Sequence, residues 1–543
     1  MRRYFVPVLV FAVAAVACFL YWQWRGKPVA IADLPGARFQ CLSYSPFEGT
    51  SGPLDKNFDV PRPIIVADLK LVKEVTGCIR TYSAIKVQGD VTRIAHEQGL
   101  QVLQGIWISG TPEDNDREIA GAVELVRAYP QTVKAIVVGN EVLLRREMTG
   151  EALASIIRRV KTETGKPVLY ADVPHFFKKE PVVAAAVDTL AIHILPYWDD
   201  PEAVGIDEVQ GHVAGIVADM RRTFPGKAMM IGEIGWPSAG RTRGGAVPSL
   251  VNQARFVREF VLGAGKLGIE YNLIEAIDQP WKRVPEGTVG GYWGIFSADR
   301  LLKFPLTGPV AEWPRWQVAF GVSLAVMLVF FAVGRTRLGL SGVDRWGAYG
   351  ALALGIGISL VHLYEYVSVT SLTIAGWVFG IYMMLLTIAA VAALSAHLGG
   401  RLEAGCDPLP HLFGRPFDPR LWSSARLIGA GYWSAAVPVA MLALAIGFDG
   451  RHRDLPVMGL WLPAVALLVL ARSRADAGRP RREEAWLSVV FAVSAVLSFD
   501  GLQNIEMMLW SAIMLMFAAA GWRDVIAESR FLLSAPVEAR RSQ

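Results

Sequence analysis

The stretch VKAIVVGNEVLLR, residues 133–145, carries an apolar run into a glycine and then into a carboxylate, Glu141. The stretch KAMMIGEIGWPSAG, residues 227–240, has the same design and presents Glu233. Short apolar runs that stop at glycine are typical of buried strands that end in a tight turn. Each glutamate is therefore predicted to lie at the end of a buried strand, and the relation between them decides what this protein can do.

Between residues 37 and 310, short apolar runs alternate with longer amphipathic stretches. Eight strands that alternate with helices predict an α/β fold, a (β/α)8 barrel. In that fold functional side chains lie at the carboxyl ends of the strands, so Glu141 and Glu233 should project over the barrel mouth. The predicted strands are ARFQCLSY, CIRTYS, QVLQGIWI, VKAIVVGN, KPVLYAD, TLAIHILPY, KAMMIGE and YNLIEAID.

Two carboxylates that face each other across a barrel mouth are the apparatus of glycoside hydrolysis, one as acid/base and the other as nucleophile or base. A single glutamate at a strand end is more often a loop residue or an ion-pair partner. Two of them, on predicted strands four and seven, favour catalysis. The carboxylates alone leave the substrate open, because a β-1,4-glucanase would carry a similar pair.

The segments VVGNEVLLR and GEIGWPS resemble the two signature segments of glycoside hydrolase family 17, the β-1,3-glucanases. CIRTYS and EAIDQPWK are similar to further segments of that family. The resemblance implies that Glu141 is the general acid/base and Glu233 the nucleophile of a retaining enzyme, with carboxyl groups about 5–5.5 Å apart. Glu141 must then hold a proton before attack, a state that the charge of Glu233 and partial burial favour.

Further site residues are expected around this pair. Asn140 is placed to hydrogen-bond the sugar 2-hydroxyl or the glycosyl ester, and Tyr197 to hydrogen-bond the nucleophile. Aromatic side chains at strand ends can stack on sugar rings, and Trp236 and Trp281 are the first candidates because they flank catalytic segments. In EAIDQPWK, Gln279 departs from the glutamate that is frequent in the family. The other predicted substrate-binding residues are Tyr82, Trp107, Trp198, Glu275, Asp278 and Lys282.

Other chemistries find no support in the sequence. The eight histidines lack the spacing of metal ligands, and His193, inside an apolar strand, is expected to be a core residue. The segment GAGKLG at 263–268 lacks the first glycine and the Ser/Thr of a phosphate loop. The soluble part has no basic face with interleaved aromatic residues. We therefore predict no metal, no cofactor and no nucleic-acid partner.

The chain of 543 residues is 53% hydrophobic and 19% charged, and its apolar residues gather outside the predicted barrel. Residues 4–24 are uncharged and long enough to cross a bilayer, with a cleaved signal peptide as the alternative. The seven further spans predicted lie near 316–334, 346–363, 371–396, 427–448, 455–471, 485–499 and 503–520. The predicted domains are an anchor at 1–26, the barrel at 27–312, a polytopic membrane domain at 313–522 and a cytoplasmic tail at 523–543.

The arginines orient these spans. Arg2 and Arg3 precede the first span, and threading the other spans in order leaves most remaining arginines on the same side, which the positive-inside rule assigns to the cytoplasm. Only Arg451 and Arg453 go against this pattern. The barrel is thus predicted on the periplasmic side, and the whole chain resembles bacterial inner-membrane members of family 17 linked to periplasmic β-glucan synthesis.

Seven spans after the barrel are more than an anchor needs. Polar groups in HLYEY, residues 362–366, and FDGLQNIE, residues 499–506, could line a glucan path or be ordinary loop polarity. The predicted cytoplasmic loops are too short for a nucleotide-sugar polymerase, so a separate glucan synthase is an expected partner. Cys41 and Cys78 fall in the exported domain and are expected to be two buried free thiols, with a disulfide, which an oxidising compartment permits, as the alternative.

The leading hypothesis is a membrane-bound retaining enzyme that elongates, branches or cyclises β-1,3-glucan by transfer. Plain hydrolysis uses the same two glutamates and differs only in whether water or a sugar attacks the intermediate. A non-catalytic glucan-binding or export component is the alternative from a different class. That alternative predicts a damaged carboxylate pair, whereas Glu141 and Glu233 are both present.

Overall fold

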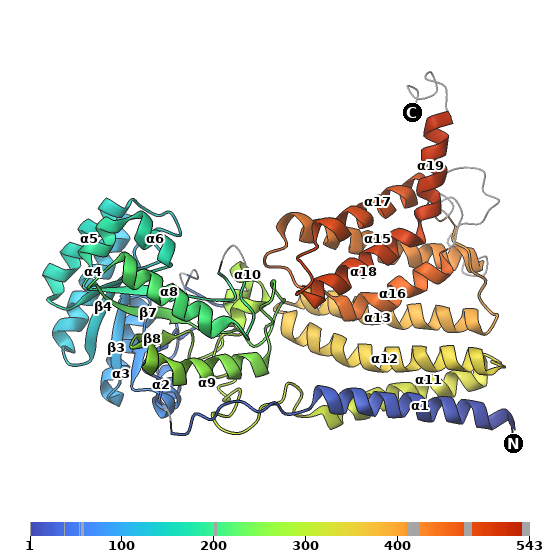
Figure 1. Cartoon of the computed structure of the whole chain (residues 1–543), viewed down its shortest axis with the longest axis horizontal. Helices are drawn as coiled ribbons and strands as arrows, with labels where there is room; N and C mark the ends of the chain where they lie inside the picture. Colours follow the sequence, from blue (N-terminus) through green and yellow to red (C-terminus); the bar gives the residue numbers. More distant parts are fainter. Residues whose placement is uncertain are drawn as a thin grey trace. The chain divides into compact units, whose positions relative to one another are not determined.

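The computed structural model describes residues 2–534, except 37, 54, 56–58, 200–202, 408, 410–411, 413–422 and 472–480. The chain divides into two compact units, which are treated separately (Figure 1). The barrel unit is Pro28–Glu312, and the helical unit combines Met1–Lys27 with Trp313–Gln543. Some of the remaining arginines that the positive-inside rule assigns to the cytoplasm lie outside the described residues, namely Arg415, Arg420, Arg472, Arg474, Arg479, Arg540 and Arg541.

Eight parallel strands close into a barrel in chain order, and β1 pairs with both β2 and β8. The predicted (β/α)8 barrel is therefore confirmed. The strands are β1 (Leu42–Ser43), β2 (Cys78–Arg80), β3 (Gln101–Ile106), β4 (Val133–Asn140), β5 (Val168–Asp172), β6 (Thr189–Ile194), β7 (Ala228–Ile234) and β8 (Glu270–Leu273).

Helices cover the outside of the barrel because their apolar residues recur on one face. In α5 (Gly150–Thr164) the buried side chains Leu153, Ile157 and Val160 are three or four residues apart. Its first turn is capped by Thr149, and it ends at Gly165, whose φ of 64° is left-handed. The other helices here are α2 (Arg62–Val75), α3 (Lys86–Gln98), α4 (Pro112–Ala128), α6 (Pro174–Lys179), α7 (Pro181–Ala186), α8 (Val209–Thr223), α9 (Leu250–Leu267), η1 (Pro280–Lys282), α10 (Arg283–Glu286) and η2 (Thr288–Gly291).

Small and apolar side chains fill the inside of the barrel. They form one buried cluster of Cys41, Cys78, Leu103, Ala135, Val137, Leu169, Ala171, Ala191 and Met230. A barrel of this kind has a packed core rather than a pore, so ligands can reach only its ends. The polar side chains that continue these strands toward their carboxyl ends therefore form the candidate site.

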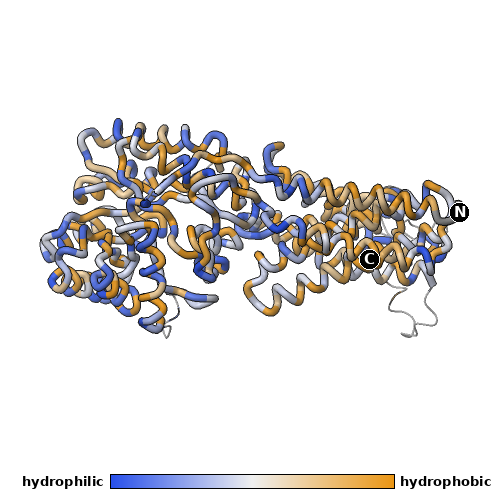
Figure 2. Tube along the Cα trace, turned by 90° about the horizontal axis from the view of Figure 1, so that it is seen from below, coloured by the Kyte–Doolittle hydropathy of each residue, from blue (hydrophilic) through white to orange (hydrophobic). Residues whose placement is uncertain are grey.

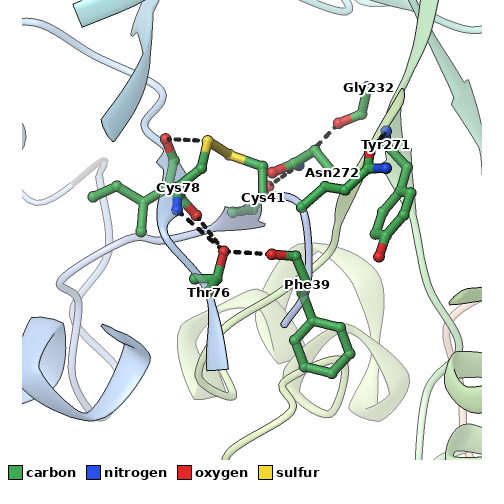
Figure 3. Close-up of a disulfide and its surroundings, with 10 residues drawn as sticks. Phe39, Cys41, Thr76, Cys78, Gly232, Tyr271 and Asn272 are labelled. Carbon is green, nitrogen blue, oxygen red and sulfur yellow. Dashed lines mark hydrogen bonds between the residues drawn. A yellow bond between two sulfur atoms is a disulfide. The ribbon is translucent and has the colours of Figure 1, made fainter. Parts of the chain in front are cut away.

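A disulfide joins Cys41 and Cys78, at the start of the first two strands (Figure 3). Thr76 lies beside it, accepting a hydrogen bond from the Cys78 amide and donating to the Phe39 carbonyl. The expectation of two free thiols is thus wrong, and the alternative, a disulfide, is present. Bonds of this type persist mainly in oxidising compartments.

The helical unit consists of helices that are hydrophobic along most of their length (Figure 2), and many of their large apolar side chains are exposed. Each of the eight predicted spans falls on a helix. These helices are α1 (Arg2–Arg25), α11 (Trp316–Arg337), α12 (Val343–Thr370), α13 (Ile374–Leu398), α15 (Ser424–Asp449), α16 (Val457–Leu470), α17 (Arg482–Leu497) and α18 (Ile505–Ala520), and α19 (Trp522–Ser534) follows them.

Helix length and composition support fewer spans than the eight predicted. Among the described residues, five helices are long and apolar enough to cross a membrane, or six if α18 and α19, bent by 51°, count as one span. Crossing takes about 20 apolar residues at 1.5 Å each. Helices α16 and α17 have only 14 and 16 residues, and this is the physical reason for the difference.

Candidate active site

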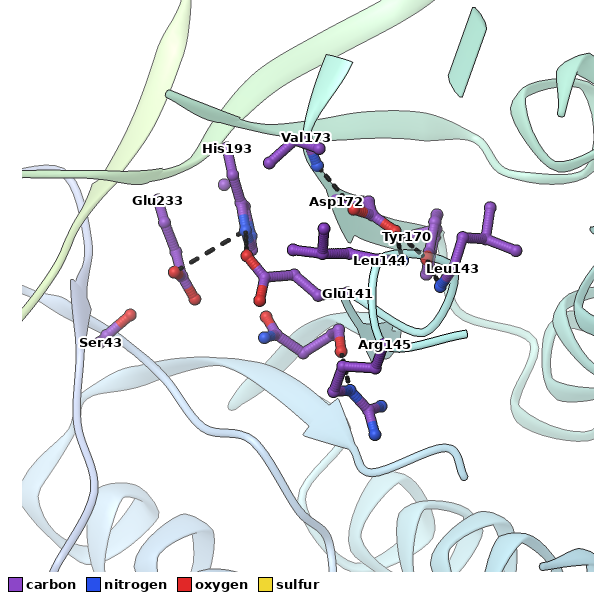
Figure 4. Close-up of polar contacts among 12 residues, drawn as sticks. Ser43, Glu141, Leu143, Leu144, Arg145, Tyr170, Asp172, Val173, His193 and Glu233 are labelled. Atoms are coloured by element: carbon purple, nitrogen blue, oxygen red, sulfur yellow. Dashed lines mark hydrogen bonds and ion pairs between the residues drawn. The ribbon is translucent and has the colours of Figure 1, made fainter. Parts of the chain in front are cut away.

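Glu141 directly follows β4 and stands in an unusual backbone conformation. Its φ is 53°, in the left-handed region that residues with a side chain seldom adopt. The turn is held by β5: the amide of Glu141 donates to the Ala171 carbonyl at 2.8 Å, and that of Leu143 to the Tyr170 hydroxyl at 3.0 Å. Tyr170 in turn donates to Asp172 (Figure 4). Backbone strain stabilised by such contacts is characteristic of functional sites.

Glu233 lies on β7 and faces Glu141 across the mouth (Figure 4). The Glu233 side chain is 6% exposed, and that of Glu141 is 24% exposed. One carboxylate oxygen of each, together with a ring nitrogen of His193, forms a group whose atoms all lie within 4.8 Å of one another. The two carboxylates are therefore close neighbours across the mouth.

The surroundings of Glu233 favour its ionised form. Arg80 Nη1 donates to Oε1 at 2.9 Å, and the Tyr82 hydroxyl donates to the same oxygen at 2.8 Å. Burial opposes ionisation, but the charges of His193, Arg80 and Lys282 outweigh it and lower the pKa of Glu233. The carboxylate is therefore held as an anion with one oxygen fixed by two donors.

Arg80 connects the two glutamate-bearing strands. Besides Glu233, it donates to the Gly232 carbonyl at 2.9 Å and, through Nη2, to Asn140 Oδ1 at 2.5 Å. The guanidinium is buried, with 2% of the side chain exposed. The sequence reasoning missed Arg80, although a charged residue in the middle of the apolar run CIRTYS was a signal for it.

His193 is fully buried, as expected of a core residue, but its contacts are those of the candidate site. Its Nδ1 lies 2.9 Å from Glu141 Oε1 and 3.8 Å from Glu233 Oε2. His193 follows Ala191 by two residues, so both point to the barrel interior, where Ala191 belongs to the packed cluster. It is also the register partner of Glu233 between β6 and β7. The apolar neighbours in the sequence hid this, because they alternate with it onto the other face.

Two aromatic predictions are wrong. Trp236 has none of its surface exposed, stacks on Phe256 and donates to the Val247 carbonyl, so it offers no face to a sugar. The Tyr197 hydroxyl donates to the Arg241 carbonyl at 2.7 Å instead of to the nucleophile candidate. The Tyr82 hydroxyl donates to Glu233 instead. Tyr82 therefore contacts the nucleophile candidate through its hydroxyl, rather than serving as the predicted stacking surface for a sugar ring.

The remaining tryptophans are partly accessible. Trp107 is 39% exposed, and the Arg145 guanidinium lies 4.2 Å from the centre of its ring. Trp281 is half-buried, with its Nε1 donating to Gln279 and one ring face covered by Gly52, where an added Cβ would come within 2.8 Å. Trp198, also half-buried, meets Tyr197 edge to face. Trp107 thus has the largest free surface of these three.

The segment after β8 divides its charges between two ion pairs. Lys282 bonds Glu275 at 2.7 Å, whereas Asp278 pairs with Lys303 at 2.9 Å. Burial raises the pKa of Glu275 to about 7 despite the opposing charge of Lys282. Both Glu275 and Lys282 act electrostatically on the Glu233 side of the site.

The family departure at Gln279 has a local reason. Its amide nitrogen donates to the carbonyls of Ser45 at 3.0 Å and Ile277 at 3.3 Å, and its side chain is fully enclosed. A glutamate has no hydrogen to give to two carbonyls unless it is protonated. Gln279 therefore joins the loop after β1 to Trp281.

Within the part of the chain that the structure describes, Glu141, His193 and Glu233 are the only three acidic, histidine or cysteine residues close enough together to hold a metal. Arg80 already occupies one oxygen of Glu233, and Lys282 adds a second positive charge nearby. These cations would repel a metal ion. The group is better suited to hold protons.

Comparison with known proteins places the barrel among carbohydrate-active enzymes. Residues 41–294 match the BtgE/BtgC glycoside hydrolase domain. A glucan 1,3-β-glucosidase of Candida albicans is 26% identical over 272 residues, spanning 44% of this chain and 84% of that protein. One from Arthroderma benhamiae is 28% identical over 263 residues, spanning 44% and 82%. The crystal structure of a glycoside hydrolase family 17 β-1,3-glucanosyltransferase from Rhizomucor miehei aligns with a TM-score of 0.43 and 24% identity, covering 50% of this chain and 98% of that one.

Proposed function

Because residues 41–294 match the BtgE/BtgC glycoside hydrolase domain, we propose that the protein is a retaining β-1,3-glucan transglycosylase of glycoside hydrolase family 17, with Glu141 and Glu233 as its catalytic residues. The observation that carries this proposal is that one oxygen of the Glu141 carboxylate and one of the Glu233 carboxylate lie within 4.8 Å of each other at the barrel mouth. Their environments differ, with Glu233 deeply buried between cationic groups and Glu141 more exposed. Such a difference assigns separate roles to two carboxyl groups.

The first half of the reaction forms a glycosyl ester. Glu233 attacks the anomeric carbon while Glu141 gives its proton to the departing sugar oxygen. Arg80 and Tyr82 hold Glu233 Oε1, which orients the carboxylate for attack. In the second half, Glu141 takes a proton from the incoming hydroxyl, which attacks the anomeric carbon and releases Glu233.

Transfer competes with hydrolysis in that second half. Water is present at about 55 M, but a bound and oriented sugar can reach a higher effective molarity. The exposed ring of Trp107 and the partly exposed rings of Trp198 and Trp281 are suitable surfaces for binding such a sugar. Plain hydrolysis of β-1,3-glucan is the second candidate, and it needs no acceptor surface.

We further propose that the protein is held in the inner membrane of a bacterium with its barrel in the periplasm. The five or six long apolar helices support membrane attachment. The arginine distribution supports the orientation, and the Cys41–Cys78 disulfide supports an oxidising compartment. A reporter fused after Gln543 should then read cytoplasmic, while protease added from the periplasmic side should digest the barrel.

Product analysis tests the enzymatic proposal. The purified full-length protein is incubated with linear β-1,3-gluco-oligosaccharides, and its products are analysed by mass and linkage. We expect products longer than the donor at high oligosaccharide concentration. Only shorter products over a wide concentration range would favour hydrolysis, and no product at all would favour a glucan-binding component.

Two variants separate catalysis from general damage. Glu233→Gln should abolish turnover because the amide is a poor nucleophile. Glu147→Gln is the matched control, because Glu147 lies near the same mouth but pairs with Arg145 at 2.7 Å. Substantial residual activity of Glu233→Gln on natural oligosaccharide would remove Glu233 from the nucleophile role.

A further inference from the structure

His193 is a buried histidine whose contacts indicate a role in catalysis rather than in packing alone. Its side chain has no exposed surface, yet Nδ1 lies in hydrogen-bond range of Glu141 Oε1 at 2.9 Å. The second nitrogen, Nε2, is buried and has no hydrogen-bond partner among the described residues. A histidine that only fills a core normally has its polar atoms paired, so an unpaired one requires another explanation.

The charges that face His193 come from four strands. Glu141 at the end of β4, Asp172 on β5 and Glu233 on β7 are acidic, and Arg80 on β2 is basic. Burial favours the neutral imidazole, but Glu233 and Glu141 outweigh both burial and Arg80 and raise the pKa of His193 above its ordinary 6.5. The ring is therefore able to keep a proton inside the site to higher pH than a free imidazole.

We propose that His193 stores the catalytic proton and shares it with Glu141 across the bond between Nδ1 and Oε1. This proposal rests on the acid/base role of Glu141 given above. His193 acts through Glu141 and does not touch the sugar, so it is a positioning residue.

The proton transfers balance over one reaction cycle. In the resting site the proton is on Nδ1 and Glu141 is ionised. On substrate binding the Nδ1–H bond breaks as an O–H bond forms on Glu141, and the leaving oxygen then takes that proton. His193 remains neutral, with its other proton on Nε2. When the acceptor hydroxyl attacks the glycosyl ester, its proton goes to Glu141 and returns to Nδ1.

This arrangement extends catalysis to higher pH. A lone glutamic acid in water loses its proton near pH 4.3, whereas a proton shared with His193 stays in the site to about pH 6.5 or above. The alkaline limb of kcat/KM, which reports the essential acid of the free enzyme, should therefore lie in that higher range.

The test compares the wild-type protein with His193→Asn, whose amide nitrogen can still donate to Glu141 but cannot carry a transferable proton. Two substrates are used with the full-length protein. One is a β-1,3-gluco-oligosaccharide, whose leaving oxygen needs a proton. The other is a 2,4-dinitrophenyl β-1,3-glucobioside, whose leaving group departs without one.

With the oligosaccharide, we expect His193→Asn to move the alkaline limb at least about one pH unit toward acid and to lower kcat/KM at pH 7 about 10-fold or more. With the aryl substrate, the initial release of dinitrophenolate should stay within about threefold of wild type, since that step needs no acid. An unchanged pH profile, or an equal loss on both substrates, would overturn the proposal.

The wild-type protein gives a second readout in case His193→Asn does not fold. An alkaline limb well below pH 6 with the oligosaccharide would also overturn the role of His193. Failure of the underlying function looks different, because wild type would then release no dinitrophenolate, or Glu233→Gln would release it equally fast.

Discussion

The Tyr82 hydroxyl donates to Glu233 Oε1 at 2.8 Å, the same oxygen that accepts from Arg80. Tyr82 has one hydroxyl proton and the carboxylate can only accept, so the Ser43 hydroxyl, 2.9 Å away, must donate to Tyr82. Asn272 donates to Ser43 at 2.8 Å. A chain of donors thus runs from inside the barrel to the nucleophile candidate.

Tyr82→Phe should therefore impair catalysis without much loss of stability. Removal of one fixed donor leaves Glu233 less well oriented, and we expect kcat to fall about 10- to 100-fold. Tyr197→Phe is the control, since its hydroxyl donates to the Arg241 carbonyl. Steady-state kinetics on oligosaccharide distinguish the two, and equal losses in both variants would contradict the assignment of Tyr82.

Trp107 and Trp236 should differ when each is replaced by alanine. Trp107→Ala removes an exposed ring at the mouth, so products should shift from transfer toward hydrolysis while thermal stability changes little. Trp236→Ala empties a fully buried site and should destabilise the barrel by about 3–5 kcal/mol. Product ratios and thermal unfolding check the pair, and a stable Trp236→Ala with altered products would restore Trp236 as a sugar platform.

Glu275 should make the barrel less stable as the pH rises. Its pKa in the folded protein is about 7, above its ordinary 4.5. A carboxyl group whose pKa is higher in the folded than in the unfolded protein stabilises the fold fully at pH values below its unfolded pKa. This stability is lost as the pH rises through the folded pKa of about 7. The melting temperature should therefore fall between pH 5 and pH 8, and less so in Glu275→Gln. The exposed variant Glu74→Gln should keep the wild-type slope, and identical slopes in all three proteins would refute the prediction.

The Cys41–Cys78 disulfide closes a loop with a sequence separation of 37. Its removal should lower the free energy of unfolding by about 2–4 kcal/mol, because the unfolded chain gains freedom. Cys41→Ser with Cys78→Ser should match the wild-type protein treated with reductant in thermal unfolding. No change in either sample would mean that the bond contributes nothing to stability.

The barrel and its two glutamates were predictable from local pattern. Eight short apolar runs alternate with amphipathic ones, and strand ends in such a fold converge on one face. The position of Glu141 and Glu233 after buried runs was therefore enough to bring them together. Apolar helices were equally visible, since a span depends on a continuous run of residues, although among the described residues five or six helices, rather than the eight predicted, are long and apolar enough to cross.

The partners of those glutamates depended on tertiary structure. His193 lies on β6, Arg80 is the last residue of β2, and Tyr82 follows that strand. Only closure of the barrel brings these three side chains to Glu141 and Glu233. Trp236 shows the reverse, because a strand-end position predicted access while packing against Phe256 buries it. Alternation along a strand tells which residues share a face, but the pairing of neighbouring strands decides what that face meets. The pattern of apolar residues along the sequence therefore determined where the two carboxylates lie. The three-dimensional fold decided which side chains keep them ionised, orient them and supply their protons.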